Sequence, residues 1–312
     1  MKVAVVLFNL GGPDSPEAVK PFLRNLFSDP AILRVPALLR GPLAWLISSR
    51  RAPTAQKIYA QIGGASPILG QTEAQARALE DALGAEHQVR AFVCMRYWHP
   101  MTDVVVQQVR AYAPERIVLL PLYPQYSTAT TQSSLDAWKS EARRLGGTTS
   151  TVLSYPVDPG FIAASVDLVQ QSLAAVGAKP HRLLFSAHGL PEKIIKAGDP
   201  YQSQVERTAA AIVAGLGPID SAVCYQSRVG PLKWIGPSTE AEIQRAGRDG
   251  KAIVLYPLSF VSEHSETLVE LDIEYRHLAD KSGVPAYHRV PTVGTHPAFI
   301  RGLADLVRGA LA

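Results

Sequence analysis

Cysteine is scarce in this chain, and long apolar runs are missing. The 312 residues contain two cysteines, Cys94 and Cys224, which form no CxxC pair. They support neither a disulfide framework nor a thiolate metal site, and they favour a reducing compartment. No run of about 18 apolar residues occurs, so we expect no membrane-spanning helix. The N-terminus has the pattern of a buried strand and lacks a secretion signal. The sequence therefore predicts a cytoplasmic protein.

Acidic residues are absent from one long stretch. No Asp or Glu occurs between Pro30 and Thr72, although the whole chain has a net charge of only +4. Residues 33–51 of this stretch combine arginines with leucines and Trp45. Such a mixture predicts a surface that meets a lipid interface or a large apolar anion. The alternative is a core helix whose arginines reach water through their long side chains. No nucleic-acid motif accompanies the charge, so a nucleic-acid partner is not expected.

Short apolar runs alternate with longer amphipathic stretches along the chain. The runs are nearly continuous in hydrophobicity, as in strands that a parallel sheet buries on both faces. They are residues 3–8, 89–94, 116–122, 183–187, 222–225 and 252–258. The amphipathic stretches, residues 72–83, 133–145, 160–175 and 202–216, have the pattern of helices. The sequence therefore predicts an α/β fold with parallel sheets flanked by helices.

An internal repeat indicates two similar domains. Residues 117–122 and 253–258 share the pattern IVLxPL, 136 positions apart. We predict a first domain over 1–150, which includes the apolar stretch 33–51, and a second over 151–285. Residues 286–312 would add a terminal strand and helix. Ligands of open α/β sheets lie beyond the carboxyl ends of the strands. The segments after the strands are therefore expected to line one cleft.

A row of carboxylates follows the last predicted strand. Glu266, Glu270 and Glu274 lie four residues apart, directly after His264. On a helix such carboxylates are neighbours that repel each other. The opposite face carries Leu268, Leu271 and Tyr275, which suits a helix with its back in a core. The row is either a solvated acidic face or a site for a divalent cation or mobile protons.

His188 stands at the end of the 183–187 strand, where a side chain reaches the predicted cleft. It is either a core histidine that a carbonyl satisfies or a base or metal ligand near neutral pH. Because Gly189 follows, we expect little cover on one side of the ring. Glu266 follows another strand and could face His188. One imidazole and one carboxylate make a sparse site, suited to a divalent ion that is passed on.

Three further segments suggest a flat or aromatic ligand. Residues 9–13, NLGGP, lack a phosphate-loop pattern, which argues against a nucleotide, and their glycines permit close approach of a flat ligand. Arg96 and Tyr97 place a cation beside aromatic rings, which suits an aromatic anion, although a packed strand end is the alternative. Trp234 lies between Gly and Pro residues in a predicted loop, where it could form a stacking wall.

Taken together, seven segments resemble the ferrochelatases, which insert Fe²⁺ into a porphyrin in haem synthesis. They occur in order as NLGGP at 9–13, RYWHP at 96–100, YPQYS at 123–127, SAHGLP at 186–191, GDPY at 198–201, QSRVGP at 226–231 and SEHSETL at 262–268. The resemblance implies a chelatase-like fold of two similar α/β domains. It also implies porphyrin and Fe²⁺ as substrates.

The resemblance assigns roles to individual residues. His188, Glu266 and Glu270 would be catalytic, with His188 and Glu266 as metal ligands. Glu270 and Glu274 would continue a proton or metal path on a π-helical stretch. The porphyrin would contact Leu10, Arg96, Tyr97 and Trp234. Residues 33–51 would form an apolar lip in peripheral contact with the inner face of the membrane.

The resemblance also limits cofactors and substrates. Some members hold a [2Fe–2S] cluster on four cysteines, which the two cysteines here cannot supply. Thr128 stands where the upstream cluster cysteine would fall, so we expect no permanent cofactor. Protoporphyrin is the expected substrate, with coproporphyrin as its alternative. A chelatase for another tetrapyrrole or metal such as cobalt, or a non-catalytic haem- or metal-binding protein, would share the same features.

Overall fold

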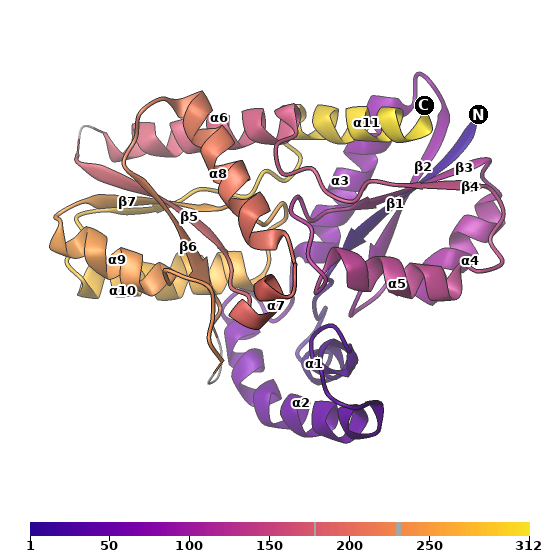
Figure 1. Cartoon of the computed structure of the whole chain (residues 1–312), viewed down its shortest axis with the longest axis horizontal. Coiled ribbons are helices and arrows are strands. Elements are labelled where there is room, and N and C mark those ends of the chain that lie inside the picture. The colour runs from indigo at the N-terminus through magenta and orange to yellow at the C-terminus, as the bar shows by residue number, and fades with distance from the viewer. Residues whose placement is uncertain (178, 229–231) are drawn as a thin grey trace. The chain divides into compact units, whose positions relative to one another are not determined.

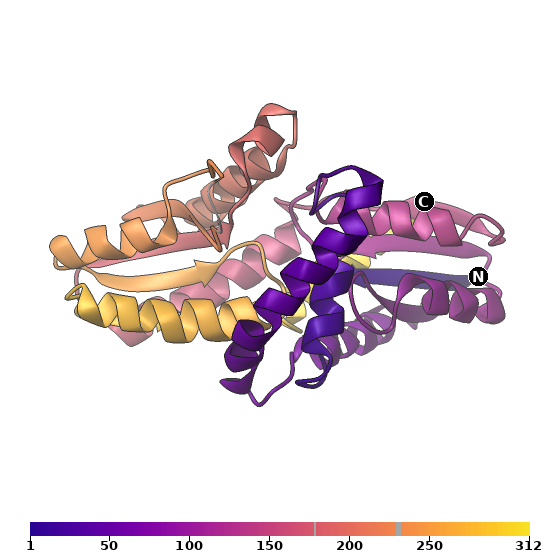
Figure 2. The same cartoon turned by 90° about the horizontal axis from the view of Figure 1, so that it is seen from below.

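The computed structural model describes residues 1–177, 179–228 and 232–312. The chain divides into two compact units, one made of Met1–Ser154 with Leu303–Ala312 and the other of Tyr155–Gly302. Each unit contains a four-stranded parallel sheet with helices along it (Figure 1 and Figure 2). The α/β architecture that the alternating apolar runs predicted is therefore confirmed.

The sheet of the first unit has the strand order β2-β1-β3-β4. Its strands are β1 (Lys2–Asn9), β2 (Gln88–Met95), β3 (Arg116–Pro121) and β4 (Thr148–Thr151), and all pair in parallel. Helices α3 (Ile68–Leu83), α4 (Thr102–Tyr112) and α5 (Thr131–Glu141) flank this sheet (Figure 1). The strand β4 escaped prediction because its four residues, TTST, are polar and mostly exposed, as an edge strand permits.

Two further helices of the first unit pack together, and the second of them contains most of the predicted lip, residues 33–51. They are α1 (Val19–Ser28) and α2 (Ala37–Ala60), which pack against each other (Figure 1). One side of α2 is buried through Ala44, Ala52 and Tyr59. The other side exposes large apolar side chains, with Leu38 at 91%, Leu39 at 60% and Trp45 at 52% exposure. This half of α2 therefore leaves apolar surface in contact with water.

The sheet of the second unit has the order β6-β5-β7-β8, the same pattern as in the first unit. Its strands are β5 (His181–His188), β6 (Ser221–Gln226), β7 (Ala252–Pro257) and β8 (Tyr287–Arg289). The repeated IVLxPL segments are β3 and β7, and each pairs with the central strand of its sheet. The internal repeat therefore marks strands that occupy equivalent positions in the two sheets. The short β8 lies within residues 286–312, where a terminal strand was expected.

The helices of the second unit are α6 (Pro159–Val176), α7 (Glu192–Lys196), α8 (Tyr201–Leu216), α9 (Thr239–Arg248) and α10 (Tyr275–Lys281). The terminal helix α11 (Pro297–Leu311) begins in the second unit and ends in the first. In the described part of the chain, no helix combines the length and apolar content needed to cross a bilayer.

The acidic row lies on a π-helix, η1 (Glu266–Glu274), as the resemblance implied. Its buried residues are Thr267, Val269 and Leu271, and Leu271 packs in a core cluster with strands β5 and β7. The wider turn of a π-helix keeps residues four apart closer to one line than an α-helix does. The glutamates of the row therefore project from one side of η1.

Candidate active site

His188 and Glu266 meet at the carboxyl end of the second sheet. His188 is the last residue of β5, and Glu266 is the first of η1. The Nδ1 atom of His188 lies 2.8 Å from Oε2 of Glu266. An ionised carboxylate only accepts hydrogen bonds, so Nδ1 carries the hydrogen. The neutral ring then has a free lone pair on Nε2. Because 40% of the His188 side chain is exposed, we expect a proton to be able to reach this ring.

Each member of this pair stabilises the charge of the other. Burial alone would lower the pKa of His188, but the charge of Glu266 and its hydrogen bond outweigh burial and raise that pKa. Burial alone would raise the pKa of Glu266, but His188 holds it well below the ordinary value. Gln226 also donates to Oε2 of Glu266, at 3.3 Å. Glu266 is therefore ionised, and His188 gains a proton readily.

Ser227 joins Glu266 to the second glutamate of the row. Its hydroxyl lies 3.0 Å from Oε2 of Glu266 and 2.5 Å from Oε2 of Glu270, and its N–H donates to Oε1 of Glu270 at 2.9 Å. Ser227 reaches both because its φ of 58° is in the left-handed region, which few non-glycine residues adopt. One hydroxyl hydrogen serves only one carboxylate, so both contacts are hydrogen bonds only if Glu270 holds a proton.

Glu270 is suited to hold that proton. Burial, together with repulsion from Glu266, raises the pKa of Glu270 to about 7. The two carboxyl groups therefore differ in protonation, as in sites where neighbouring acids take separate roles. Glu274, the last of the row, is exposed, and no hydrogen bond to its side chain is found among the described residues. The row thus runs from a half-buried ion pair to water.

The opposite oxygen of Glu266 faces His264. Oε1 of Glu266 lies 3.9 Å from Nε2 of His264, too far for a hydrogen bond. That Nε2 atom is buried and has no hydrogen-bond partner within the described ranges. Nowhere in those ranges do three or more His, Cys, Asp or Glu side chains form a metal-binding group. A divalent ion at this place would therefore meet a few nitrogen and oxygen atoms and keep open positions.

The His188 side chain is 40% exposed, in line with the expected lack of cover on one side of the ring, whereas Gly189 itself is closely surrounded. A Cβ atom on Gly189 would lie 2.8 Å from the carbonyl oxygen of Gln226 and 3.4 Å from the ring of Trp234. The glycine is needed because neighbouring groups approach closely. Trp234 lies in a loop, as predicted, with only an isolated bridge to Pro191. Residues 229–231 of the QSRVGP motif lie outside the described residues.

The other predicted porphyrin contacts belong to the first unit. Leu10 is partly buried against its core, and Tyr97 is 1% exposed. The Tyr97 hydroxyl donates to Oδ2 of Asp29 at 2.8 Å, and a guanidinium nitrogen of Arg96 lies 2.8 Å from the same oxygen. The structure therefore engages Arg96 and Tyr97 with a buried aspartate that sequence reasoning missed. Their contact with a porphyrin stays a prediction.

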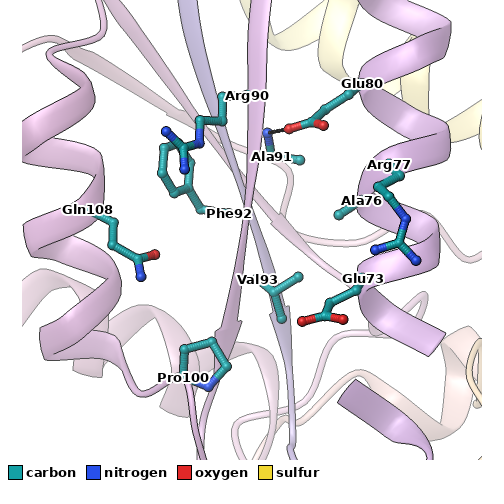
Figure 3. Close-up of a pocket in the computed structure, with 10 residues that line it drawn as sticks. All are labelled: Glu73, Ala76, Arg77, Glu80, Arg90, Ala91, Phe92, Val93, Pro100 and Gln108. Carbon is teal, nitrogen blue, oxygen red and sulfur yellow. Dashed lines mark hydrogen bonds between the residues drawn. The ribbon is translucent and has the colours of Figure 1, made fainter. Parts of the chain in front are cut away.

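A surface pocket of about 360 Å³ lies elsewhere in the first unit, beside the edge strand β2 (Figure 3). Its walls carry Arg77, Arg90, Glu73 and Glu80, and Glu80 accepts the backbone N–H of Ala91 at 2.7 Å. That bond covers part of the free strand edge. The pocket shares no residue with the predicted site, so we assign it no part in the chemistry.

The raised pKa of Glu270 makes a testable contribution to stability. Between the unfolded pKa of about 4.3 and the folded pKa of about 7, the folded chain binds more protons at this group. Stability from Glu270 therefore falls as pH rises through that interval. We expect Glu270→Gln to be about 2 kcal/mol more stable than wild type at pH 8 but not at pH 4.5. Urea unfolding at both pH values measures this, and an equal effect at both would contradict it.

Comparison with known proteins gives matches along almost the whole chain. A family model described as ferrochelatase matches residues 2–311. Ferrochelatases from Caulobacter vibrioides and Phenylobacterium zucineum are 57% and 56% identical, over 99% and 100% of this chain and 90% and 92% of theirs. The ferrochelatase from Pelagibacter ubique is 51% identical over 98% of this chain and 91% of its own.

Solved structures show the same architecture at low identity. SirB from Bacillus subtilis with Fe³⁺ has a TM-score of 0.59 at 14% identity, covering 100% of this chain and 96% of its own. CbiX, described as the terminal enzyme of sirohaem biosynthesis in denitrifying bacteria, has a TM-score of 0.51 at 16% identity and covers both chains fully. These likenesses concern the fold alone, and they confirm the predicted chelatase-like class.

Proposed function

This chain belongs to the ferrochelatase family, and from that premise we propose that His188, Glu266 and Glu270 form the centre at which it inserts ferrous iron. The protein is a lyase of haem synthesis that metallates a porphyrin. The observation that carries the proposal is the 2.8 Å bond between His188 and Glu266, with Glu270 joined to Glu266 through Ser227. It supplies a base, a fixed negative charge and a second proton acceptor at one place.

Metallation requires two pyrrole protons to leave the ring. Each N–H bond breaks so that its electron pair remains on nitrogen, where it then binds iron. We propose that Nε2 of His188 accepts each pyrrole proton in turn, and that the ionised Glu266 stabilises the imidazolium that forms. A distorted macrocycle exposes its nitrogens to the base, at a strain of about 1–5 kcal/mol drawn from remote contacts. Leu10, Arg96, Tyr97 and Trp234 are the proposed sources of those contacts.

Ferrous iron, the second substrate, must lose water before it enters the ring. Oε1 of Glu266 accepts no hydrogen bond among the described residues, so it is available to replace one water ligand. His188 is the second proposed ligand, which it becomes once its proton has gone. Glu270 and the exposed Glu274 extend the acidic row towards solvent and would lead iron in or protons out.

We propose protoporphyrin as the substrate and no permanent cofactor. Cys94 and Cys224 are buried, and burial raises the pKa of each thiol to about 12. Such thiols are poor thiolate ligands for an iron–sulfur cluster. Neither a nucleotide nor a nucleic acid takes part in this proposal. Anaerobic incubation with Fe²⁺, followed by absorbance, tests it with protoporphyrin and coproporphyrin in parallel, and Co²⁺ in place of Fe²⁺ tests the metal. Faster turnover of coproporphyrin would reverse the assignment.

We also propose that the lip, residues 33–51, meets a membrane surface from the cytoplasmic side. Support comes from the exposed Leu38, Leu39 and Trp45 and from the arginines beside them, which suit anionic lipid headgroups. Buried, unpaired cysteines fit a reducing compartment.

Replacing Trp45 by glutamate should weaken this membrane contact. The change removes an aromatic side chain that favours the lipid interface and adds a negative charge facing anionic headgroups. We expect the fraction of protein that sediments with anionic vesicles to fall at least about threefold. Leu153→Glu is the matched control, because Leu153 is similarly exposed at 55% but lies outside the lip. Equal losses in both variants, or none in Trp45→Glu, would reject the lip as the contact.

A further inference from the structure

The hydroxyl of Tyr275 lies between two carboxyl groups. It is 3.2 Å from Oε1 of Glu270 and 3.0 Å from Oε1 of Glu240. Tyr275 begins α10, and Glu240 stands in the first turn of α9, the helix that packs beside α10 (Figure 1). The tyrosine ring is 4% exposed and packs with Ile243 in a core cluster. The core therefore fixes the position of this hydroxyl.

A phenol has one hydrogen, which it donates to one carboxylate at a time. Both contacts of Tyr275 are hydrogen bonds only when one of the two carboxyl groups brings a proton. Glu240 lies in the first turn of α9 and is partly exposed to water. Glu270 lies near the ionised Glu266, whose charge favours the neutral form. When the one proton of Glu270 is on Oε1, Glu270 donates to Tyr275 and Tyr275 donates to Glu240, and the Ser227 hydroxyl then donates to only one of its two carboxyl groups.

The two oxygens of Glu270 face different partners. Oε2 meets the Ser227 hydroxyl, which also contacts Glu266, and Oε1 meets Tyr275. A proton can therefore enter on one oxygen and leave from the other. Beyond Glu270, the hydrogen bonds of the described residues lead to Tyr275 and Glu240, and none leads to Glu274. Glu240 is partly exposed, so the line ends at water.

We propose that Tyr275 and Glu240 relay to solvent the protons that metallation delivers to Glu270. The inference rests on the proposed roles of His188 and Glu266. In each step Oε1 of Glu270 gives its proton to the phenol oxygen as the phenol gives its own to Glu240. A new proton reaches Oε2 of Glu270 through Ser227, and Glu240 releases one to water. Tyr275 stays neutral throughout, since burial and the two nearby carboxylates raise its pKa. Both residues act through Glu270, so they are positioning and relay residues.

Two substitutions test the relay in single-turnover metallation of protoporphyrin by Fe²⁺, with enzyme in excess under anaerobic conditions. Tyr275→Phe removes the hydroxyl, and Glu240→Gln keeps an oxygen that accepts from Tyr275 but does not take up a proton. We expect each to slow metallation on the order of tenfold, below the full effect of losing an acid or base. The KM for porphyrin, measured separately at steady state, should not change, and the solvent deuterium isotope effect on the single-turnover rate should increase.

Tyr287→Phe is the matched control. Its hydroxyl is also buried and donates to η1, at the carbonyl oxygen of Leu271, but among the described residues it makes no hydrogen bond to a carboxyl group. A wild-type rate in this control, with slow metallation in both test variants, supports the relay. An equal loss in the control would assign the effect to disturbance of η1 and overturn it. Wild-type rates in both test variants, or a loss in Glu274→Gln alone, would also overturn it.

A His188→Ala measurement in the same assay separates the two levels of inference. If His188→Ala is inactive while Glu240→Gln is unaffected, the relay is wrong and the proposed active site stands. If His188→Ala retains its rate, the proposed active site itself is wrong.

Discussion

His188→Ala should abolish metallation, with turnover reduced about a thousandfold or more, while porphyrin still binds. The imidazole of His188 is hydrogen-bonded to Glu266 through Nδ1, which leaves a lone pair on Nε2. That lone pair is the proposed acceptor of a pyrrole proton. Removing it also leaves the Glu266 carboxylate without its main counter-charge, so iron would be held without a coupled proton acceptor. Anaerobic absorbance gives turnover, and quenching of tryptophan fluorescence gives porphyrin affinity.

His181→Ala is the matched control for this result. His181 lies at the opposite end of the same strand, where its ring contacts the carbonyl oxygen of Lys179 at 3.0 Å. We expect turnover within twofold of wild type, because the ring is remote from η1 along β5. Retained turnover in His188→Ala would remove this histidine from the mechanism. Loss of porphyrin binding would show that the substitution disturbs the folding of the end of β5, and the loss of turnover would then say nothing about proton transfer.

The central strands were predictable because strands that are buried on both faces have continuous apolar sequences. Residues 3–8 and 252–257 are buried almost completely, and only a strand inside a parallel sheet reads in that way. The edge strand β4 is short and polar, so it looks like a loop, whereas the short edge strand β8 lies where a terminal strand was expected. Pairing with a neighbour, which no local pattern records, makes β4 a strand.

The site was predictable where a side chain terminates such a strand. His188 ends β5, and Glu266 opens the segment that follows β7, so topology alone brings them to one edge. Ser227 was missed because its role depends on a left-handed φ of 58°. Tyr275 was interpreted as a core residue, which describes its ring but not its hydroxyl. Glu240 is 26 positions from Glu266 in sequence, on a helix whose placement sequence patterns do not give.

Gly189 shows the limit of interpreting a glycine from sequence. The 40% exposed side chain of His188 agrees with the expected lack of cover, whereas Gly189 itself lies close to the Gln226 carbonyl and the Trp234 ring. Both interpretations require a residue without Cβ, so the residue type alone does not separate them. The distinction matters because a crowded Gly189 holds the histidine in place.

Asp29→Ala should strongly destabilise the first unit, by about 3 kcal/mol. Oδ2 of Asp29 accepts the Tyr97 hydroxyl, faces the Arg96 guanidinium at 2.8 Å and accepts a further bond from the Ser133 hydroxyl. Its side chain is 2% exposed, and its loss leaves Arg96, itself 21% exposed, without a counter-charge. Asp29 follows α1, so the same contacts tie the lip to the sheet.

The same cluster decides between two roles for Arg96. If Arg96 mainly holds Asp29, then Arg96→Met should cost similar stability, and the double variant should lose much less than the sum of the two. If Arg96 mainly binds porphyrin, Arg96→Met should raise KM at wild-type stability. Urea unfolding and porphyrin titration of the three variants separate these results. Asp81→Ala, at an exposed position on α3, is the control and should lie within about 0.5 kcal/mol of wild type. We expect the structural result, because Arg96 and Tyr97 meet one buried carboxylate whose desolvation their charge and hydrogen bonds help to offset.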